Sequence, residues 1–157
     1  MRKIFTAIII AIFISSCVQI KTNDTSISSS QDVEEVEVLI QNIFDDIWSD
    51  HKAEVISKYH TDDFLLLEHG EVWNNDTIAN WCKMAAMRDN GSKRINNFER
   101  ISAKQDGNKI WLAYHNYATI TKDSMERNLS WLESVVAVKK DSIWQLELMH
   151  STRNTKN

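Results

Sequence analysis

The residue types with acid–base potential fall in three strand-like segments in the second half of the chain. Tyr114 lies in "WLAYHN", Glu133 in "WLESVV" and His150 at the end of "WQLELMH". A carboxylate raises the pKa of a neighbouring histidine, and burial raises the pKa of the carboxylate itself. Either group can then move a proton, while a tyrosine hydroxyl can donate to a developing oxyanion. Acid–base catalysis by His150, Glu133 and Tyr114 therefore requires that their side chains share one face of a sheet.

The turn between the last two segments decides which side chains share that face. A hairpin loop at residues 140–141 pairs Trp131 with His150 and Glu133 with Leu148. We expect this mostly apolar face to be the concave core face of the sheet. An inserted bulge would shift one strand and separate the set. The opposite face then carries the polar residues Ser134, Gln145, Glu147 and Ser151.

The preceding hairpin extends the same face. An even loop there adds Tyr114 and Asn116 beside Glu133. The predicted site then has His150, Glu133 and Tyr114 as catalytic candidates, with Trp131 and Asn116 as ligand contacts. The same residues also fit a purely structural interpretation, in which Glu133 and His150 satisfy each other as buried hydrogen-bonding groups.

The elements that must position these residues are helical first and extended later. Apolar residues from Val36 to Trp48 recur at helical spacing, and Asp32 with Glu35 fits a capping box at the start of that helix. Further along, the patterns predict a short helix over 50–60, a β-hairpin over 62–74 turning at His69 and Gly70, a helix from Asp76 to Arg88 capped by Asn75 or Asp76, and strands over 93–105, 109–121, 128–139 and 142–152. Helices grouped before a meander of strands indicate an α+β fold with an antiparallel sheet.

This order of elements over residues 32–153 resembles the SnoaL-like branch of the nuclear transport factor 2-like superfamily. The segments "YHTDDFLLLEHGEVW" and "DSIWQLELMHST" carry the resemblance. It implies a cone in which N-terminal helices pack on a curved, mainly antiparallel sheet around an apolar pocket. It also places Asp62 near the pocket entrance and implies a homodimer through the outer face of the sheet.

The superfamily contains enzymes as well as binding domains, so function has to be argued from the site. The first hypothesis is a domain that binds a small, mostly apolar ligand between Trp131, Tyr114, Trp81 and His150. The second is an isomerase- or dehydratase-type enzyme, with Glu133 or His150 as the acid–base group and Tyr114 as electrophile. The third is a dimeric interaction module without a ligand.

The N-terminus has the pattern of an export signal. Residues 1–16 combine Arg2 and Lys3 with an apolar run that is too short to span a membrane. The following "ISSC" resembles a bacterial lipobox, which implies cleavage before Cys17 and lipidation of its thiol. We therefore expect a signal peptide over 1–16, a polar tether over 17–31, the domain over 32–153, a tail over 154–157, and a lipid anchor in the bacterial cell envelope.

Several function classes are disfavoured. Loss of Arg2 and Lys3 takes the formal charge from −4 to −6, and an acidic exported domain is a poor nucleic-acid partner. The five histidines lack the spacing of a metal motif, and three glycines cannot supply a phosphate-binding loop. Cys82 is flanked by apolar residues, and we expect its side chain to be buried. We expect neither a metal nor a cofactor.

Overall fold

The computed structural model describes residues 25–88 and 91–155. The predicted signal peptide, Cys17 and the first part of the predicted tether lie outside the described residues. The rest of that tether, from Thr25 onward, belongs to the first helix. No helix in the described part of the chain is long and apolar enough to cross a membrane.

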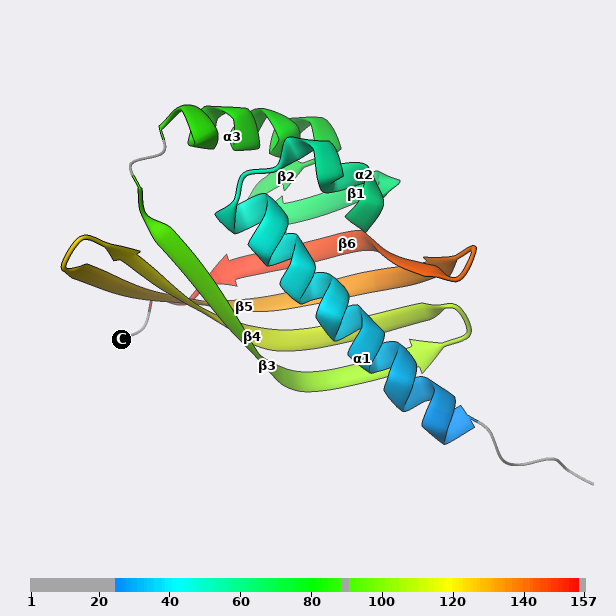
Figure 1. Cartoon of the computed structure of the whole chain (residues 1–157). Coiled ribbons are helices and arrows are strands. Elements are labelled where there is room, and N and C mark those ends of the chain that lie inside the picture. Colours follow the sequence, from blue (N-terminus) through cyan, green and yellow to red (C-terminus); the bar gives the residue numbers. More distant parts are fainter. Residues whose placement is uncertain (1–24, 89–90, 156–157) are drawn as a thin grey trace, which may run out of the picture.

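The helices lie on one side of the sheet. Helix α1 (Thr25–Ile43) continues directly into a π-helical segment, η1 (Phe44–Ser49). A 3₁₀ turn, η2 (Ala53–Val55), leads into the short α2 (Ile56–Tyr59), and α3 (Asn75–Met87) follows the first hairpin. Figure 1 shows α1 crossing the sheet diagonally, with α2 and α3 grouped near one edge of the sheet.

Six strands form one sheet in the order β2-β1-β6-β5-β4-β3. All neighbours are antiparallel except β1 and β6, which run parallel. The strands are β1 (His60–Glu68), β2 (Glu71–Trp73), β3 (Lys93–Asp106), β4 (Lys109–Lys122), β5 (Met125–Lys140) and β6 (Ile143–Arg153). The predicted α+β class and the curved, mainly antiparallel sheet under N-terminal helices are thus confirmed (Figure 1).

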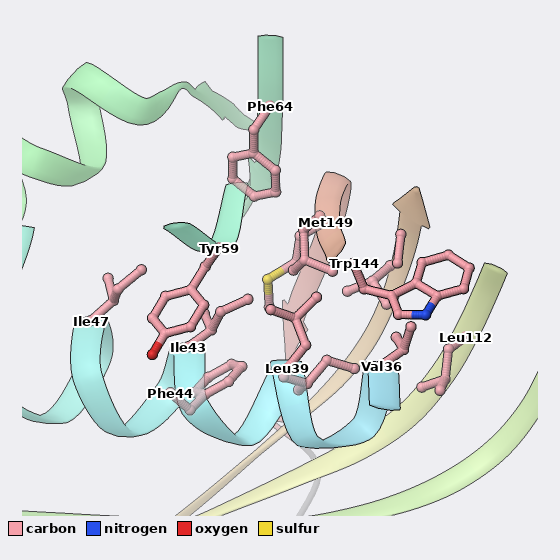
Figure 2. Close-up of a cluster of buried hydrophobic side chains, with 14 of the residues drawn as sticks. Val36, Leu39, Ile43, Phe44, Ile47, Tyr59, Phe64, Leu112, Trp144 and Met149 are labelled. Atoms are coloured by element: carbon pink, nitrogen blue, oxygen red, sulfur yellow. The ribbon is translucent and has the colours of Figure 1, made fainter. Parts of the chain in front are cut away.

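The core lies between α1 and the concave face of the sheet. Val36 and Ile47 are completely buried, and Ile43 is 1% exposed, so the predicted apolar stripe does face inward. Figure 2 shows this stripe meeting Trp144 and Met149 of β6. Each fully buried aliphatic side chain of this kind contributes about 1.5–3 kcal/mol, which makes this contact the main support of the helix.

Both predicted helix caps are wrong. Asp32 lies inside α1 because the helix begins at Thr25, and its carboxylate instead accepts hydrogen bonds of 2.7 Å from Lys139 and from Gln105. These contacts tie α1 to the sheet, and the Lys139 bond lowers the pKa of Asp32. Helix α3 is capped by Asn74, whose side chain accepts the backbone N–H of Thr77 at 2.9 Å, in place of Asn75 or Asp76.

The predicted pairing of the last hairpin is also wrong from the turn onward, because Ala137 pairs with Leu146 in place of Trp144, although the first residues of β6 keep the predicted face. The turn is Asp141-Ser142, both at positive φ, so Lys140 pairs with Ile143. A bulge follows: Val136 pairs with Leu148 but Ala137 pairs with Leu146, which leaves Glu147 unpaired. The extra residue reverses the facing of every later side chain in β6.

This reversal places His150 on the other face of the sheet. It pairs with Ser134 on the outer face and is exposed, whereas Ser151 pairs with Glu133 and is 2% exposed. The prediction that His150 faces the core and Ser151 faces outward is therefore wrong, because the bulge at Glu147 reverses both. The preceding hairpin does have an even, two-residue turn, and Tyr114 pairs with Glu133 as its parity predicts.

Candidate functional site

A cavity of 180 Å³ opens between the helices and the concave face of the sheet. Five of its eleven lining residues are aromatic, and two carboxylates and one guanidinium supply its charges. We refer to it as the tryptophan pocket. Its lining residues are Phe44, Trp48, Leu66, Glu68, Trp73, Trp81, Arg94, Trp131, Glu133, Met149 and Ser151.

The aromatic wall is a connected set of rings. Trp48 of η1 packs against Trp81 of α3, with ring centres 4.9 Å apart, and against Phe44 at 6.3 Å. Phe44 in turn contacts Phe98 of β3 at 5.1 Å. Tilted ring pairs at these distances stabilise one another, so the wall is a connected apolar surface suited to a small apolar or aromatic body.

Arg94 of β3 brings a positive charge into this pocket. Its guanidinium carbon lies 5.1 Å from the ring centre of Trp131 and 5.7 Å from that of Phe44, both within the range of a cation–π contact. Burial lowers the pKa of Arg94, against the opposing effects of Glu133 and Glu68. Neither of these carboxylates forms an ion pair with it among the described residues.

Glu133 of β5 lies at the base of the pocket and is 4% exposed. Its Oε1 accepts a hydrogen bond of 2.9 Å from the Ser151 hydroxyl, and its Oε2 accepts one of 3.2 Å from the Asn116 amide. Burial raises the pKa of Glu133 to about 7, although these donors favour the charged form. The carboxyl group can therefore exchange a proton near neutral pH.

A directed chain of hydrogen bonds joins Arg94 to Glu133 across three strands. Arg94 Nε donates to Asn96 Oδ1 at 2.9 Å, and Asn96 Nδ2 donates to Asn116 Oδ1 at 2.6 Å. Asn116 then donates to Glu133, so every donor points from the cation toward the carboxylate. Asn96 and Asn116 are 2% and 0% exposed, so they form the floor beneath the pocket and fix its two charged ends.

Tyr114 lies next to this network but not in the tryptophan pocket. Its side chain is fully buried and lines a separate groove of 530 Å³ between α1 and β3, together with residues such as Phe98 and Arg100. Its hydroxyl lies close enough to Glu133 to affect the pKa of both groups, although it forms no hydrogen bond of regular geometry among the described residues. Burial and the nearby Glu133 raise the pKa of Tyr114 well above its usual value, so it stays protonated.

The structure thus brings together only part of the predicted site. Glu133, Trp131 and Trp81 line the pocket, and Asn116 supports it from below. His150 is exposed on the outer face, where its Nε2 lies 3.4 Å from Thr152 Oγ1. Asp62 is an exposed residue of β1 and does not line the pocket.

Sequence reasoning missed Arg94, Glu68, Trp73 and the pocket role of Trp48. Arg94 and Asn96 lie two residues apart in a segment predicted to be a strand, so their side chains share one face. The sequence did not show which face this is, because a second bulge interrupts the strand. Arg100 pairs with Tyr114 while Ser102 pairs with Ala113, which leaves Ile101 extra. This bulge turns Arg94, Asn96 and Phe98 onto the concave face.

His60, which the sequence analysis did not include in the site, is 2% exposed and has a structural role. Its ring stacks on Phe64 with centres 3.9 Å apart, and Nδ1 lies 3.0 Å from Asn75 Oδ1. The Asn75 amide donates to the Thr61 carbonyl oxygen at 2.8 Å. This arrangement joins α3 to β1, and burial lowers the pKa of His60 to about 4.

Within the described residues, no group of three or more histidine, cysteine, aspartate or glutamate side chains is arranged to hold a metal ion. Cys82 is a buried free thiol whose pKa is raised by burial, as expected for a core residue. Acid–base chemistry at Glu133 and the binding of a small molecule are thus the two activities that this geometry supports.

No family model matches the sequence, and no curated protein matches it significantly. Solved structures do match the fold. One is an NTF2-like protein with a cystatin-like fold from Novosphingobium aromaticivorans, with a TM-score of 0.66 at 14% identity over 85% of this chain and 88% of that chain. Another is a ketosteroid isomerase-like protein from Erwinia carotovora, with a TM-score of 0.59 at 13% identity over 80% and 98%.

A third match is the CamKII hub homology domain of Chlamydomonas reinhardtii, with a TM-score of 0.69 at 15% identity over 79% of this chain and 99% of that chain. Together with the observed order of helices and strands, these similarities show that the chain has the nuclear transport factor 2-like cone fold. The predicted fold is confirmed. The fold alone does not decide between binding and catalysis, so function has to be argued from the site.

Proposed function

We propose that this protein binds a small, mostly apolar molecule in the tryptophan pocket. The observation that carries the proposal is the aromatic wall: four tryptophans and Phe44 surround a cavity of 180 Å³ that also contains polar groups at its base. Small-molecule sites in proteins typically combine an apolar, concave lining with a few fixed polar groups. A volume below the usual range points to a ligand of one or two rings.

Mass spectrometry of small molecules extracted from the native protein tests this proposal directly. The expected result is one enriched compound whose rebinding changes the tryptophan fluorescence. Trp131→Ala should weaken that binding by about tenfold or more, because an aromatic anchor is lost. Tyr117→Ala removes an aromatic ring that is 43% exposed on the outer face, and it should bind the compound like the wild type. Equal weakening by both variants would contradict the assignment of the pocket.

A second candidate function is proton transfer to or from the bound molecule. It is favoured by Glu133, whose buried carboxyl has a pKa of about 7 at the base of the same pocket. A general acid or base works best when its pKa lies near the working pH. Glu133→Gln should then abolish isotope exchange into the bound compound while leaving its affinity within a few fold. His150→Ala should have no effect, since His150 is on the other face.

For assembly, we propose a homodimer through the outer face of the sheet. The proposal is supported by exposed leucines on that face, with Leu65 at 41%, Leu67 at 37% and Leu132 at 52% exposure. Apolar side chains grouped in this way on a sheet commonly mark an interface. Light scattering after size exclusion should give twice the chain mass for the wild type and one chain mass for Leu132→Glu. A monomeric wild type would overturn this proposal.

For location, we propose a lipid anchor at Cys17 in the bacterial cell envelope. It rests on the sequence around "ISSC" alone. Metabolic labelling with a fatty-acid analogue should mark the wild type and leave Cys17→Ser unlabelled. The variant should also move out of the membrane fraction, and an unlabelled wild type would contradict the anchor.

A further inference from the structure

We propose that the ligand of the tryptophan pocket is a small organic acid, whose carboxylate pairs with Arg94 and whose apolar part lies among the tryptophans. This inference rests on the proposed binding function and adds the chemical class of the ligand. It starts from Arg94, the one cation among the described residues that line the pocket.

Arg94 is held in place but its charge is not paired. Its Nε is used by Asn96 at 2.9 Å, and its guanidinium plane is positioned by Trp131 and Phe44. Among the described residues no carboxylate lies within ion-pair distance of it, and its two Nη groups donate to no side chain. A guanidinium offers its donors in a fixed fork that fits a carboxylate. Arg94 is thus a fixed binding site for an anion.

The position over the ring of Trp131 is also closed to a ligand cation. A ligand cation would meet the positive charge of Arg94, which already occupies the cation–π position over Trp131. The other charged groups in the pocket are Glu68 of β1 and Glu133 of β5. Glu133 can be neutral near pH 7, so it does not have to oppose a bound carboxylate and can donate a hydrogen bond to it.

The shape of the pocket narrows the class further. On the side of η1 and α3 the wall is formed by Trp48 and Trp81, whose ring centres are 4.9 Å apart. A flat apolar body gains most from such a surface, because stacked rings bury the largest area for their size. A single ring bearing one carboxylate therefore satisfies both Arg94 and the volume of 180 Å³.

Isothermal titration with three matched probes tests the inference on the purified protein. Benzoate, benzamide and benzylamine share one ring and differ in charge. We expect benzoate to bind at least about tenfold more tightly than benzamide, because charge-assisted hydrogen bonds are stronger than neutral ones. Benzylamine should bind more weakly than either. Arg94→Gln should remove the preference for benzoate and keep the weak binding of benzamide.

Arg100→Gln is the matched control. Arg100 is on the same strand but pairs with Glu37 of α1 at 3.3 Å, outside the tryptophan pocket, so the same loss of charge there should leave the preference intact. Circular dichroism of each variant checks that it is folded. Equal affinity for benzoate and benzamide would overturn the acid class while the pocket still binds. Binding of none of the three probes would overturn the acid class too, and it would also count against the proposed function.

Discussion

The Ser151 hydroxyl donates a hydrogen bond of 2.9 Å to Oε1 of Glu133, across the pair of strands β6 and β5. This contact places a hydroxyl donor against a carboxyl group that burial would otherwise keep neutral. Asn116 donates to the other oxygen of the same group. Glu133 is therefore held between a cost of desolvation, which raises its pKa, and its neighbouring donors, which lower it.

The first prediction concerns the pH dependence of stability due to Glu133. Burial raises its pKa from 4.5 to about 7 in the folded state, so the folded protein binds the proton more tightly than the unfolded chain. This contribution to the free energy of unfolding is complete below pH 4.5 and is lost as the pH rises through 7. Its upper size is about 3 kcal/mol. Urea denaturation should show a higher free energy of unfolding for Glu133→Gln than for the wild type at pH 8, and little gain at pH 4.5. An unchanged pH profile in the variant would contradict the assignment.

The second prediction concerns the donor. Ser151→Ala removes a hydrogen bond that favours the charged form of Glu133, so the pKa of Glu133 should rise further above its usual value. Carbon NMR of labelled glutamate carboxyl groups measures this directly. At pH 8 the variant should lose about 1 kcal/mol of the free energy of unfolding, the typical value for one buried hydrogen bond. Ser134→Ala, on the outer face of β5, is the control and should change neither quantity. A Glu133 titration that does not move would show that Ser151 is not its partner.

How far the sequence could lead to this site depends on single residues in the strands. Periodicity was enough for the apolar stripe of α1 and for the parity of the β4–β5 turn, which places Tyr114 and Glu133 as a pair. It failed at Glu147 and Ile101, where one extra residue in β6 and β3 reverses the facing of everything beyond it. A bulge is stabilised by curvature and packing of the whole sheet, and no local residue pattern marks it.

The same two bulges explain which functional candidates changed. The bulge at Glu147 exchanges His150 for Ser151 at the base of the pocket, and the bulge at Ile101 brings in Arg94. The predicted candidate Glu133 does line the pocket, and acid–base chemistry there stays a prediction. The cation, however, could be located only once the tertiary structure fixed the register of β3.

The third prediction separates His60 from Glu133. Burial lowers the pKa of His60 from 6.5 to about 4, so the unfolded chain binds its proton more readily than the folded protein. The contribution of His60 to the free energy of unfolding is complete above pH 6.5 and is lost as the pH falls toward 4, with an upper size of about 3 kcal/mol. As the pH rises, the stabilising contribution of His60 increases while that of Glu133 decreases, over nearly the same pH range. The wild type should therefore show a flat profile from pH 4.5 to 7.

Glu133→Gln should make the effect of His60 visible, since of these two groups only the histidine then binds its proton differently in the folded and unfolded states. The free energy of unfolding of that variant should rise from pH 4.5 to 6.5. Adding His60→Gln should flatten the profile again and lower stability overall, because the stacking on Phe64 is lost. A double variant that still gains stability with pH over this range would show that another group, and not His60, is responsible.

The fourth prediction connects the charge of the ligand to the proton on Glu133. Five groups face this carboxyl. They are Arg94 from β3, Glu68 from β1, Tyr114 and Asn116 from β4, and Ser151 from β6. A carboxylate bound at Arg94 adds a negative charge close to Glu133 and offsets the influence of Arg94, so it should raise the pKa of Glu133 further. Benzoate binding at pH 7 should therefore take up a fraction of a proton from the buffer. Titration calorimetry in two buffers that differ in ionisation enthalpy measures this uptake, which Glu133→Gln should abolish while benzoate still binds. Benzamide, which carries no charge, should bind without proton uptake. Equal proton uptake for both probes would show that protonation of Glu133 does not depend on the charge of the ligand.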